Sequence, residues 1–333
     1  MNLKKIGLTA LAGSLVATSV YAGELAVSGS ASMKVVHVNG GAANTGKSFS
    51  MGNSVTFSGG GELDNGLTVA VSFELDQGAA NNSAVTSTGT IAANSGAVFD
   101  SHSVTVSSDA LGSLTFAGHG GSSAQSAIDT TAAGDLWDST FGISAAQDPK
   151  SSATSNNMIS YTLPSIVDGV ALAASYVPTS STVKASSTAY SIAYTGVEGL
   201  AVHYASGEDN GTTGSTADVD TIKATYSYGP ISVGYSSTEY DNENTGADQD
   251  QDVESYSISY TVSENISISY GSETISEPND TDDQDIEISG ITASYTTGGM
   301  TISGAMIDAD NTAMGTGATE DKQHWNLAAS FAF

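Results

Sequence analysis

The sequence predicts an all-β protein, a transmembrane antiparallel up-and-down β-barrel of about 16 strands. Three observations lead to this prediction. Apolar and small polar residues alternate with period two along most of the chain. Short connections rich in turn residues alternate with long ones. Beyond the N-terminal segment no long apolar run occurs, which excludes helical membrane spans.

The N-terminal segment is typical of a cleaved signal peptide. Lys4 and Lys5 precede the apolar or small residues 6–20, and Val20-Tyr21-Ala22 matches the small-residue cleavage pattern. A membrane anchor would need a longer run, of about 18 apolar residues. We therefore expect residues 1–22 to be removed and residues 23–333 to form a single barrel domain.

The composition excludes several classes of protein. The chain has no Cys, and its basic residues are eight Lys without any Arg, against 36 Asp and Glu. Removing Lys4 and Lys5 takes the formal charge from −28 to −30. Nucleic acid is an implausible partner, because little here would neutralise phosphates. A disordered acidic chain is the alternative, but the 39% of apolar residues and their ordered alternation argue against it.

Strand-like alternation is clearest in a set of short segments. They are residues 188–195, 222–228, 231–236, 255–262 and 265–270. The segment 285–296 is weaker, because Ile286 and Ile288 fall on one face whereas Ile291 and Tyr295 fall on the other. A β-bulge near Gly290 would reconcile the two halves.

Connections of two lengths separate these strands. The short ones are 64–66, 109–113, 164–169, 196–199, 229–230, 263–265 and 296–299, and the long ones are 39–47, 77–100, 121–156, 178–187, 207–219, 241–253, 276–284 and 309–320. Seven short and eight long connections imply about sixteen strands with both ends on the same side. Short turns on one side and long loops on the other are typical of outer-membrane barrels.

The two faces of the predicted strands differ in a way that favours a membrane barrel. One face is mostly Ser, Thr, Ala and Gly, which suits a wet lumen better than a packed core. The other face is apolar and rich in Tyr from Tyr161 to Tyr295, and Tyr anchors at lipid headgroups.

Several motifs in order make the chain resemble the general porins of Gram-negative bacteria, especially the alphaproteobacterial type. They are the signal peptide, the segment ELAVSGSASMKVV at 24–36, the turn at 63–66, the segment NMISY at 157–161 followed by Pro164, and the terminal Phe333. The resemblance implies an outer-membrane location, a sixteen-stranded barrel and usually a trimer. It also implies that the third long loop folds into the pore and narrows it.

Candidate site residues follow from the resemblance and from the parity of each strand. The resemblance implies that acidic residues of the third loop face basic residues on the barrel wall. The candidate acidic residues are Asp129, Asp135, Asp138 and Asp148 in the loop, and Glu74 on the wall. The candidate basic or titratable wall residues are Lys34, Lys223, Lys322, His119, His203 and His324. Solvated charges with no joint role are the alternative.

Two features qualify this picture of the site. Lys34, Lys322 and His324 are expected to form a basic cluster, because the first and last strands are neighbours in a closed barrel. Members of the family commonly carry Arg on the wall, whereas this chain has none, so a strong transverse field is in doubt. The acidic balance favours cations.

Calcium is a possible ligand of the outer loops. Asp248, Asp250 and Asp252 could offer carboxylate oxygens, as could the acidic run 280–287. The spacing is not that of an EF-hand, because the sixth position is Val253 rather than Gly. A solvated acidic loop is the alternative.

The expected function is passive diffusion of ions and small polar solutes, without catalysis and with a preference for cations. The sequence has no G-x-S-x-G motif and no His pair at metal-ligand spacing. A secreted β-solenoid or adhesin is the main alternative, although it would show repeats of fixed period. An outer-membrane hydrolase that uses His119 or His203 is a second alternative.

The distribution of Tyr predicts how the barrel meets its surroundings. Of 14 Tyr, Tyr21 lies in the signal peptide and the other 13 lie between Tyr161 and Tyr295. The first five and last two strands therefore have no Tyr girdle. We expect this side to pack against other subunits of a homotrimer and the remaining strands to face outer-membrane lipid.

Overall fold

The structure, a computed structural model, describes most of the chain beyond residue 24. The described residues are 25–40, 46–76, 99–128, 132, 136, 148–153, 156–179, 185–210, 216–243, 250–278, 284–312, 314 and 321–333. The expected signal peptide, residues 1–22, lies outside them. The described part of the chain contains no helix that is long and apolar enough to cross a membrane.

Sixteen strands make up the regular structure of the described residues. They are β1 (Leu25–Gly40), β2 (Gly46–Glu62), β3 (Thr68–Asp76), β4 (Ser101–Ser108), β5 (Gly112–His119), β6 (Met158–Thr162), β7 (Val170–Val177), β8 (Ser187–Tyr194), β9 (Leu200–Glu208), β10 (Ala217–Tyr228), β11 (Ile231–Asn242), β12 (Gln251–Ser263), β13 (Ile266–Ser276), β14 (Ile286–Thr297), β15 (Met300–Asp310) and β16 (Lys322–Ala332).

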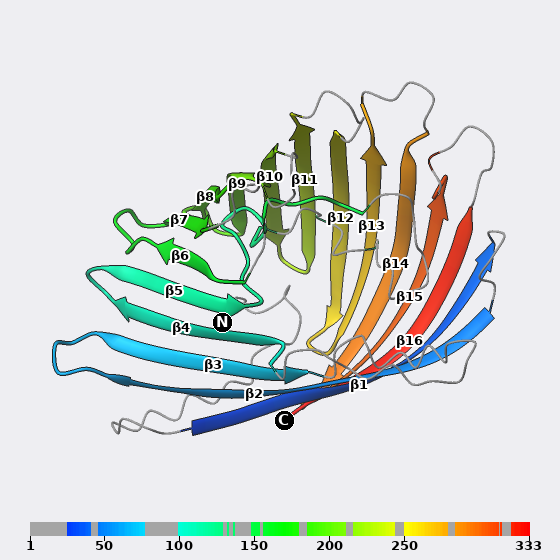
Figure 1. The fold of residues 1–333 in the computed structure, drawn as a ribbon. Helices are drawn as coiled ribbons and strands as arrows, with labels where there is room; N and C mark the ends of the chain where they lie inside the picture. The colour runs from blue at the N-terminus through cyan, green and yellow to red at the C-terminus, as the bar shows by residue number, and fades with distance from the viewer. Residues whose placement is uncertain are drawn as a thin grey trace, which may run out of the picture.

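These strands form one closed antiparallel barrel, which confirms the predicted fold class. Each strand pairs with its neighbours in sequence, and β16 pairs with β1 to close the ring (Figure 1). The closure ends on Phe333, whose backbone N–H and C=O exchange hydrogen bonds with Gly29 at 3.0 and 2.9 Å. Closure leaves no free sheet edge, which a barrel in lipid requires.

The connections alternate in length as the sequence predicts, with short turns at one end of the barrel and long connections at the other. The turn between β2 and β3 shows why the local sequence closes so tightly. Gly66 has φ +81°, a left-handed conformation that favours glycine, and its N–H donates to the carbonyl of Leu63 at 2.9 Å. The side-chain oxygen of Asn65 accepts from the N–H of Leu67 at 3.2 Å.

The height of the wall varies around the barrel. Strands β3 to β9 have 5 to 9 residues, whereas β10 to β16 have 11 to 13. On the other side of the closure, β1 and β2 have 16 and 17 residues. The tall part of the wall therefore runs from β10 through β16 to β2.

The two faces of the wall carry the side chains that the alternation predicts. Tyr and aliphatic residues such as Tyr226, Ile258 and Tyr270 are exposed on one face. The residues that alternate with them are mainly Ser, Thr, Ala and Gly. In a transmembrane barrel the first face meets lipid and the second lines the lumen.

The expected bulge near Gly290 is wrong. Pairing of β14 runs without a shift through Gly290 on both sides, opposite Gly271 of β13 and Ile307 of β15. Ile286 and Ile288 therefore point into the barrel, where they are 0% and 1% exposed. The irregularities within these ladders lie elsewhere, between His102 and Ser103 of β4 and between Thr261 and Ser263 of β12.

Candidate pore constriction

The connection between β5 and β6, residues 120–157, lies against the inner face of the wall where it is described. Near its start, the backbone N–H of Ala124 donates to Ser175 Oγ of β7 at 2.9 Å. The Gln125 side-chain nitrogen donates to Thr221 Oγ1 of β10 at 2.9 Å. Both Gln125 and Thr221 are buried, so these polar groups satisfy each other away from water.

Farther along, the same connection reaches β12 and β13. The N–H of Ala132 donates to Ser255 Oγ at 2.9 Å, and the N–H of Leu136 donates to a carboxylate oxygen of Glu273 at 3.4 Å. Ser255 and Glu273 are both fully buried. The first arm of the connection thus crosses the inner wall from β7 to β13.

The second arm of the connection contacts both the wall and the first arm. Gln251 of β12 accepts from the N–H of Lys150 at 2.7 Å and donates to the carbonyl of Asp148 at 3.0 Å. Gln125 accepts from the N–H of Ser152 at 2.7 Å. Gln251 on the wall therefore holds the second arm with both its donor and its acceptor. Gln125 in the first arm donates to the wall and accepts from the second arm, so it joins the two arms.

An apolar cluster lies inside the barrel, where the connection packs against the wall. Leu136 of the connection and Met314 of the last loop pack with inner-face residues of β12 to β15. Those wall residues are Val253, Ile275, Ile286, Ile288, Ile307 and Ala309. All are nearly inaccessible to solvent, so this part of the upper lumen is filled and dry.

Lys150 is a cation that the sequence reasoning did not single out. Its ammonium lies 4.8 Å from the centre of the Tyr240 ring, a cation–π arrangement. Burial lowers the pKa of Lys150, and the carboxylates of Glu277, Asp250 and Asp209 oppose that shift. A single Lys within an acidic stretch is the signal that could have found it.

The acidic candidates are placed only in part. Asp129, Asp135 and Asp138 lie outside the described residues, and Asp148 contacts the wall through its backbone carbonyl. Glu74 of β3 lies on the inner face, where a carboxylate oxygen accepts from Ser101 Oγ at 3.1 Å. The structure therefore places one acidic candidate on the wall and leaves the constriction role of the others as a prediction.

The basic candidates do not form one compact cluster. Lys322 pairs with Gly40, whereas Lys34 pairs with Ala328, so six residues separate the two Lys along the ladder. That is roughly 20 Å of strand. His324 is buried two residues beyond Lys322 on the same face. A second inner-face pair does form, because Lys223 of β10 lies directly opposite His203 of β9.

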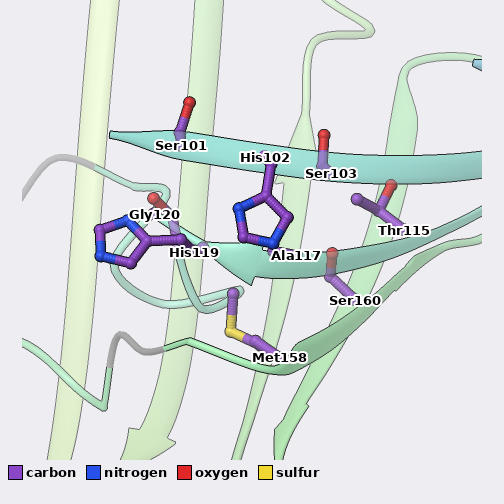
Figure 2. Close-up of a pocket in the computed structure, with 11 residues that line it drawn as sticks. Ser101, His102, Ser103, Thr115, Ala117, His119, Gly120, Met158 and Ser160 are labelled. Carbon is purple, nitrogen blue, oxygen red and sulfur yellow. The ribbon is translucent and has the colours of Figure 1, made fainter. Parts of the chain in front are cut away.

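His119 lies beside a hollow at the root of the connection (Figure 2). Its Nδ1 is hydrogen-bonded to the carbonyl of Asp100. Figure 2 shows Ser101 and Ser103 pointing to one side of β4 and His102 to the other. His102 fits because Gly118 lacks a side chain, since a Cβ there would lie 2.0 Å from the His102 ring.

Hydroxyl groups line much of the inner wall in cross-strand pairs. These pairs are Ser30 with Ser54, Thr105 with Thr115, Ser227 with Ser232, Ser267 with Ser294, and Thr296 with Thr301, at 2.7–3.0 Å. A surface of small neutral hydroxyls can exchange hydrogen bonds with water and with polar solutes. The arrangement suits passage of solutes rather than their retention.

The possible calcium ligands are partly described. Asp250 Oδ1 accepts from the N–H of Asn242 at 2.8 Å, Asp252 lies on β12, and Asp248 lies outside the described residues. Within the described ranges, no three acidic or His residues come close enough to hold a metal ion. Calcium binding stays a prediction.

Comparison with known proteins agrees with this architecture. A family model described as Gram-negative porin matches residues 7–310. No curated protein sequence matches the chain. Among solved structures, an anion-selective porin from Comamonas acidovorans superposes with a TM-score of 0.68 at 15% identity, covering 93% of this chain and 99% of that one.

Two further solved structures show the same fold. A porin refined at 1.8 Å resolution has a TM-score of 0.63 at 20% identity, covering 93% of this chain and all of that one. A loop-deletion mutant of an outer-membrane protein of Vibrio cholerae has a TM-score of 0.62 at 14% identity, covering 94% of this chain and all of that one.

Proposed function

Because the chain belongs to the Gram-negative porin family, we propose that this outer-membrane channel passes ions and small polar solutes through a pore narrowed by the connection 120–157. The observation that carries the proposal is the set of hydrogen bonds from this connection to inner-wall residues of β7, β10, β12 and β13. A segment fixed on the inner wall takes up part of the lumen and reduces the open cross-section, and pore dimensions and lining groups determine what passes.

The filled apolar cluster supports the same proposal. Leu136 and Met314 occupy the upper lumen beside β12 to β15, so water and solutes must pass nearer the shorter strands. There the described inner face is rich in Ser and Thr. Neutral sugars and small ions fit such a path better than apolar solutes, which gain nothing from a hydroxyl lining.

We also propose that the pore prefers cations. The chain has 36 acidic residues against eight Lys, and Asp209, Asp250, Glu277 and Asp321 lie in the long connections at the mouth. Carboxylates around an entrance raise the local concentration of cations and repel anions. The Comamonas porin is anion-selective, but at 15% identity the likeness concerns the fold.

Subunit contacts are a further part of the proposal. The outer face of β1 to β5, β15 and β16 carries no Tyr, whereas every strand from β6 to β14 except β11 carries an exposed Tyr. Tyr prefers the headgroup level of a bilayer. We propose that the Tyr-free side packs against other copies in a homotrimer.

Single-channel recording in a planar bilayer tests the channel function. The purified protein should give discrete, passive conductance steps that increase in proportion to salt concentration. A protein that inserts without conducting would contradict the proposal. The role of the connection is tested separately by Gln125→Ala, which weakens its attachment to the wall.

A further inference from the structure

The outer face of β16, β1 and β2 brings three side chains together at the upper margin of the barrel. His37 of β1 lies directly opposite Lys47 of β2 on one side and Trp325 of β16 on the other. The His37 and Trp325 rings are 5.8 Å apart and tilted by 55°. We call this group, His37, Lys47 and Trp325, the cationic edge.

The cationic edge lies where the apolar band of the barrel ends. Directly below it on the same face are Val35, Phe49 and Leu327, and then Met33 and Met51. Phe49 and Met51 are 61% and 66% exposed. Directly above it, Asn39 lies opposite Gln323. A change from apolar to polar side chains beside an exposed Trp marks the headgroup level of a bilayer.

The charge of this margin changes around the barrel. On β9 to β15 the outer face above the apolar band carries acidic residues, several of them directly opposite one another. They are Glu208, Asp218, Asp220, Glu239, Asp241, Asp252, Glu254, Glu287, Asp308 and Asp310. Among the described Lys residues, Lys34, Lys223 and Lys322 lie on the inner face and Lys150 lies in a connection. Lys47 is thus the one on the outer face.

From this contrast we propose that the cationic edge binds the phosphate of an anionic membrane lipid. Lys47 is exposed and can place its ammonium, a compact donor of three hydrogen bonds, against a phosphate. His37 adds a ring N–H, and the Trp325 ring packs beside the glycerol or sugar part of the headgroup. The acyl chains lie along Val35, Phe49 and Leu327.

A lipid accounts for the site better than a free anion does. A free phosphate would use the cation but not the exposed apolar surface directly beneath it. On β9 to β15 the outer-face carboxylates repel a phosphate, which favours binding of anionic lipid at the cationic edge over that part of the margin. The proposed site is confined to this position because Lys47 is a cation, whereas the outer-face charges on β9 to β15 are carboxylates.

The site is compatible with subunit contacts through the same strands. Val27, which we expect in the subunit contact, lies ten residues below His37 on β1, roughly 34 Å along the strand. Strand β3 ends at Asp76, opposite Ser54, so β2 continues seven residues beyond it to Lys47. Lys47 therefore stands above the part of the wall where neighbouring copies would meet.

The intrinsic fluorescence of Trp325 gives a direct test. The chain has two Trp, so Trp137→Phe leaves Trp325 alone, and the purified full-length protein is titrated in mild detergent with short-chain phosphatidic acid. We expect a saturable change in emission. Lys47→Gln should weaken binding about fivefold, the effect of about one cation beside an anionic lipid. His37→Gln in addition should weaken it further.

Several controls distinguish binding at the cationic edge from binding elsewhere on the barrel. Lys322→Gln, on the inner face, should leave the titration unchanged. An equal response to phosphatidylcholine or to inorganic phosphate would overturn the proposal, as would wild-type affinity in Lys47→Gln. A Lys47→Cys variant that forms an efficient disulfide between copies in the membrane would overturn it too, because a second copy would then cover the edge. Lipid binding is read without conductance, so failure here leaves the channel proposal standing.

Discussion

The side-chain amide of Gln125 lies 2.9 Å from Thr221 Oγ1, which joins the start of the third long connection to a strand 96 residues away. The same amide accepts from the N–H of Ser152, and Thr221 also contacts Thr238 at 3.0 Å. Because all of these groups are buried, the contact fixes both arms of the connection to the inner wall at β10.

Gln125→Ala should loosen the connection without unfolding the barrel. The change leaves the buried Ser152 N–H without its acceptor, at a cost of about 1–3 kcal/mol, and removes the Gln125 donor from Thr221, which keeps its contact with Thr238. We expect larger or noisier single-channel steps. Ser227→Ala, which removes an inner-wall hydroxyl far from the connection, is the matched control. Identical records for Gln125→Ala and the wild type would contradict the assigned role.

Ile288→Ala should destabilise the apolar cluster inside the barrel. The residue is 1% exposed, and large-to-small changes at such sites cost about 2–5 kcal/mol. We expect a lower unfolding temperature of the barrel in detergent and faster cleavage of the third connection by protease. Ile291→Ala lies on the outer face of the same strand and should have the smaller effect. Equal effects of the two substitutions would show that the cluster is not packed.

The strands and turns could be predicted because their signals are local. Alternation fixes which residues share a face, and turn residues fix where a strand ends. Alternation does not reveal which part of the inner face is covered by a loop that packs inside the barrel. Ile286 and Ile288 therefore looked displaced by a bulge, when in fact they face Leu136, about 150 residues earlier in the chain.

The site was harder to predict than the fold for the same reason. Gln125 and Gln251 have no motif around them, and their role depends on two arms of a long connection meeting one wall. Topology correctly places the strands of Lys34 and Lys322 together. The register of that pair nevertheless separates the two side chains, because strands in a barrel are staggered.

Lys150 should titrate below the ordinary value of a lysine. Burial lowers its pKa in the folded protein, so between the folded and the unfolded pKa the unfolded chain binds more protons. The free energy of unfolding should therefore rise with pH across that alkaline window and stay level below it. The titration can be followed by NMR of isotope-labelled Lys, with Lys150→Met to assign the signal. A pKa at or above 10.5 would contradict the burial argument.

The reversal potential under a potassium chloride gradient should show a preference for potassium. Asp135→Asn together with Asp138→Asn should reduce that preference, if the connection carries these carboxylates into the constriction. Low salt is needed, because the Debye length falls from about 30 Å at 0.01 M to about 10 Å at 0.1 M. An anion-selective wild-type pore would refute the proposed preference. An unchanged double variant would place the selective charges elsewhere, for example at Glu74.

Crosslinks should join copies through the Tyr-free side and not through the Tyr-bearing side. Val27 is 55% exposed on β1, and Val71 shares its face on β3, whereas Tyr226 and Tyr256 are exposed on β10 and β12. Tyr at the headgroup level favours contact with lipid. A large apolar surface without such Tyr is instead stabilised by packing against another copy. Val27→Cys or Val71→Cys should therefore give covalent oligomers in native membranes.

Tyr226→Cys and Tyr256→Cys serve as the matched controls, because both positions lie on the outer face of tall strands. These two variants should stay monomeric under the same oxidation. Channel records add a second readout, since three pores in one particle close in three steps. Crosslinking at Tyr226 or Tyr256, or single-step closure with monomeric migration in mild detergent, would refute the assignment of the Tyr-free side to subunit contacts.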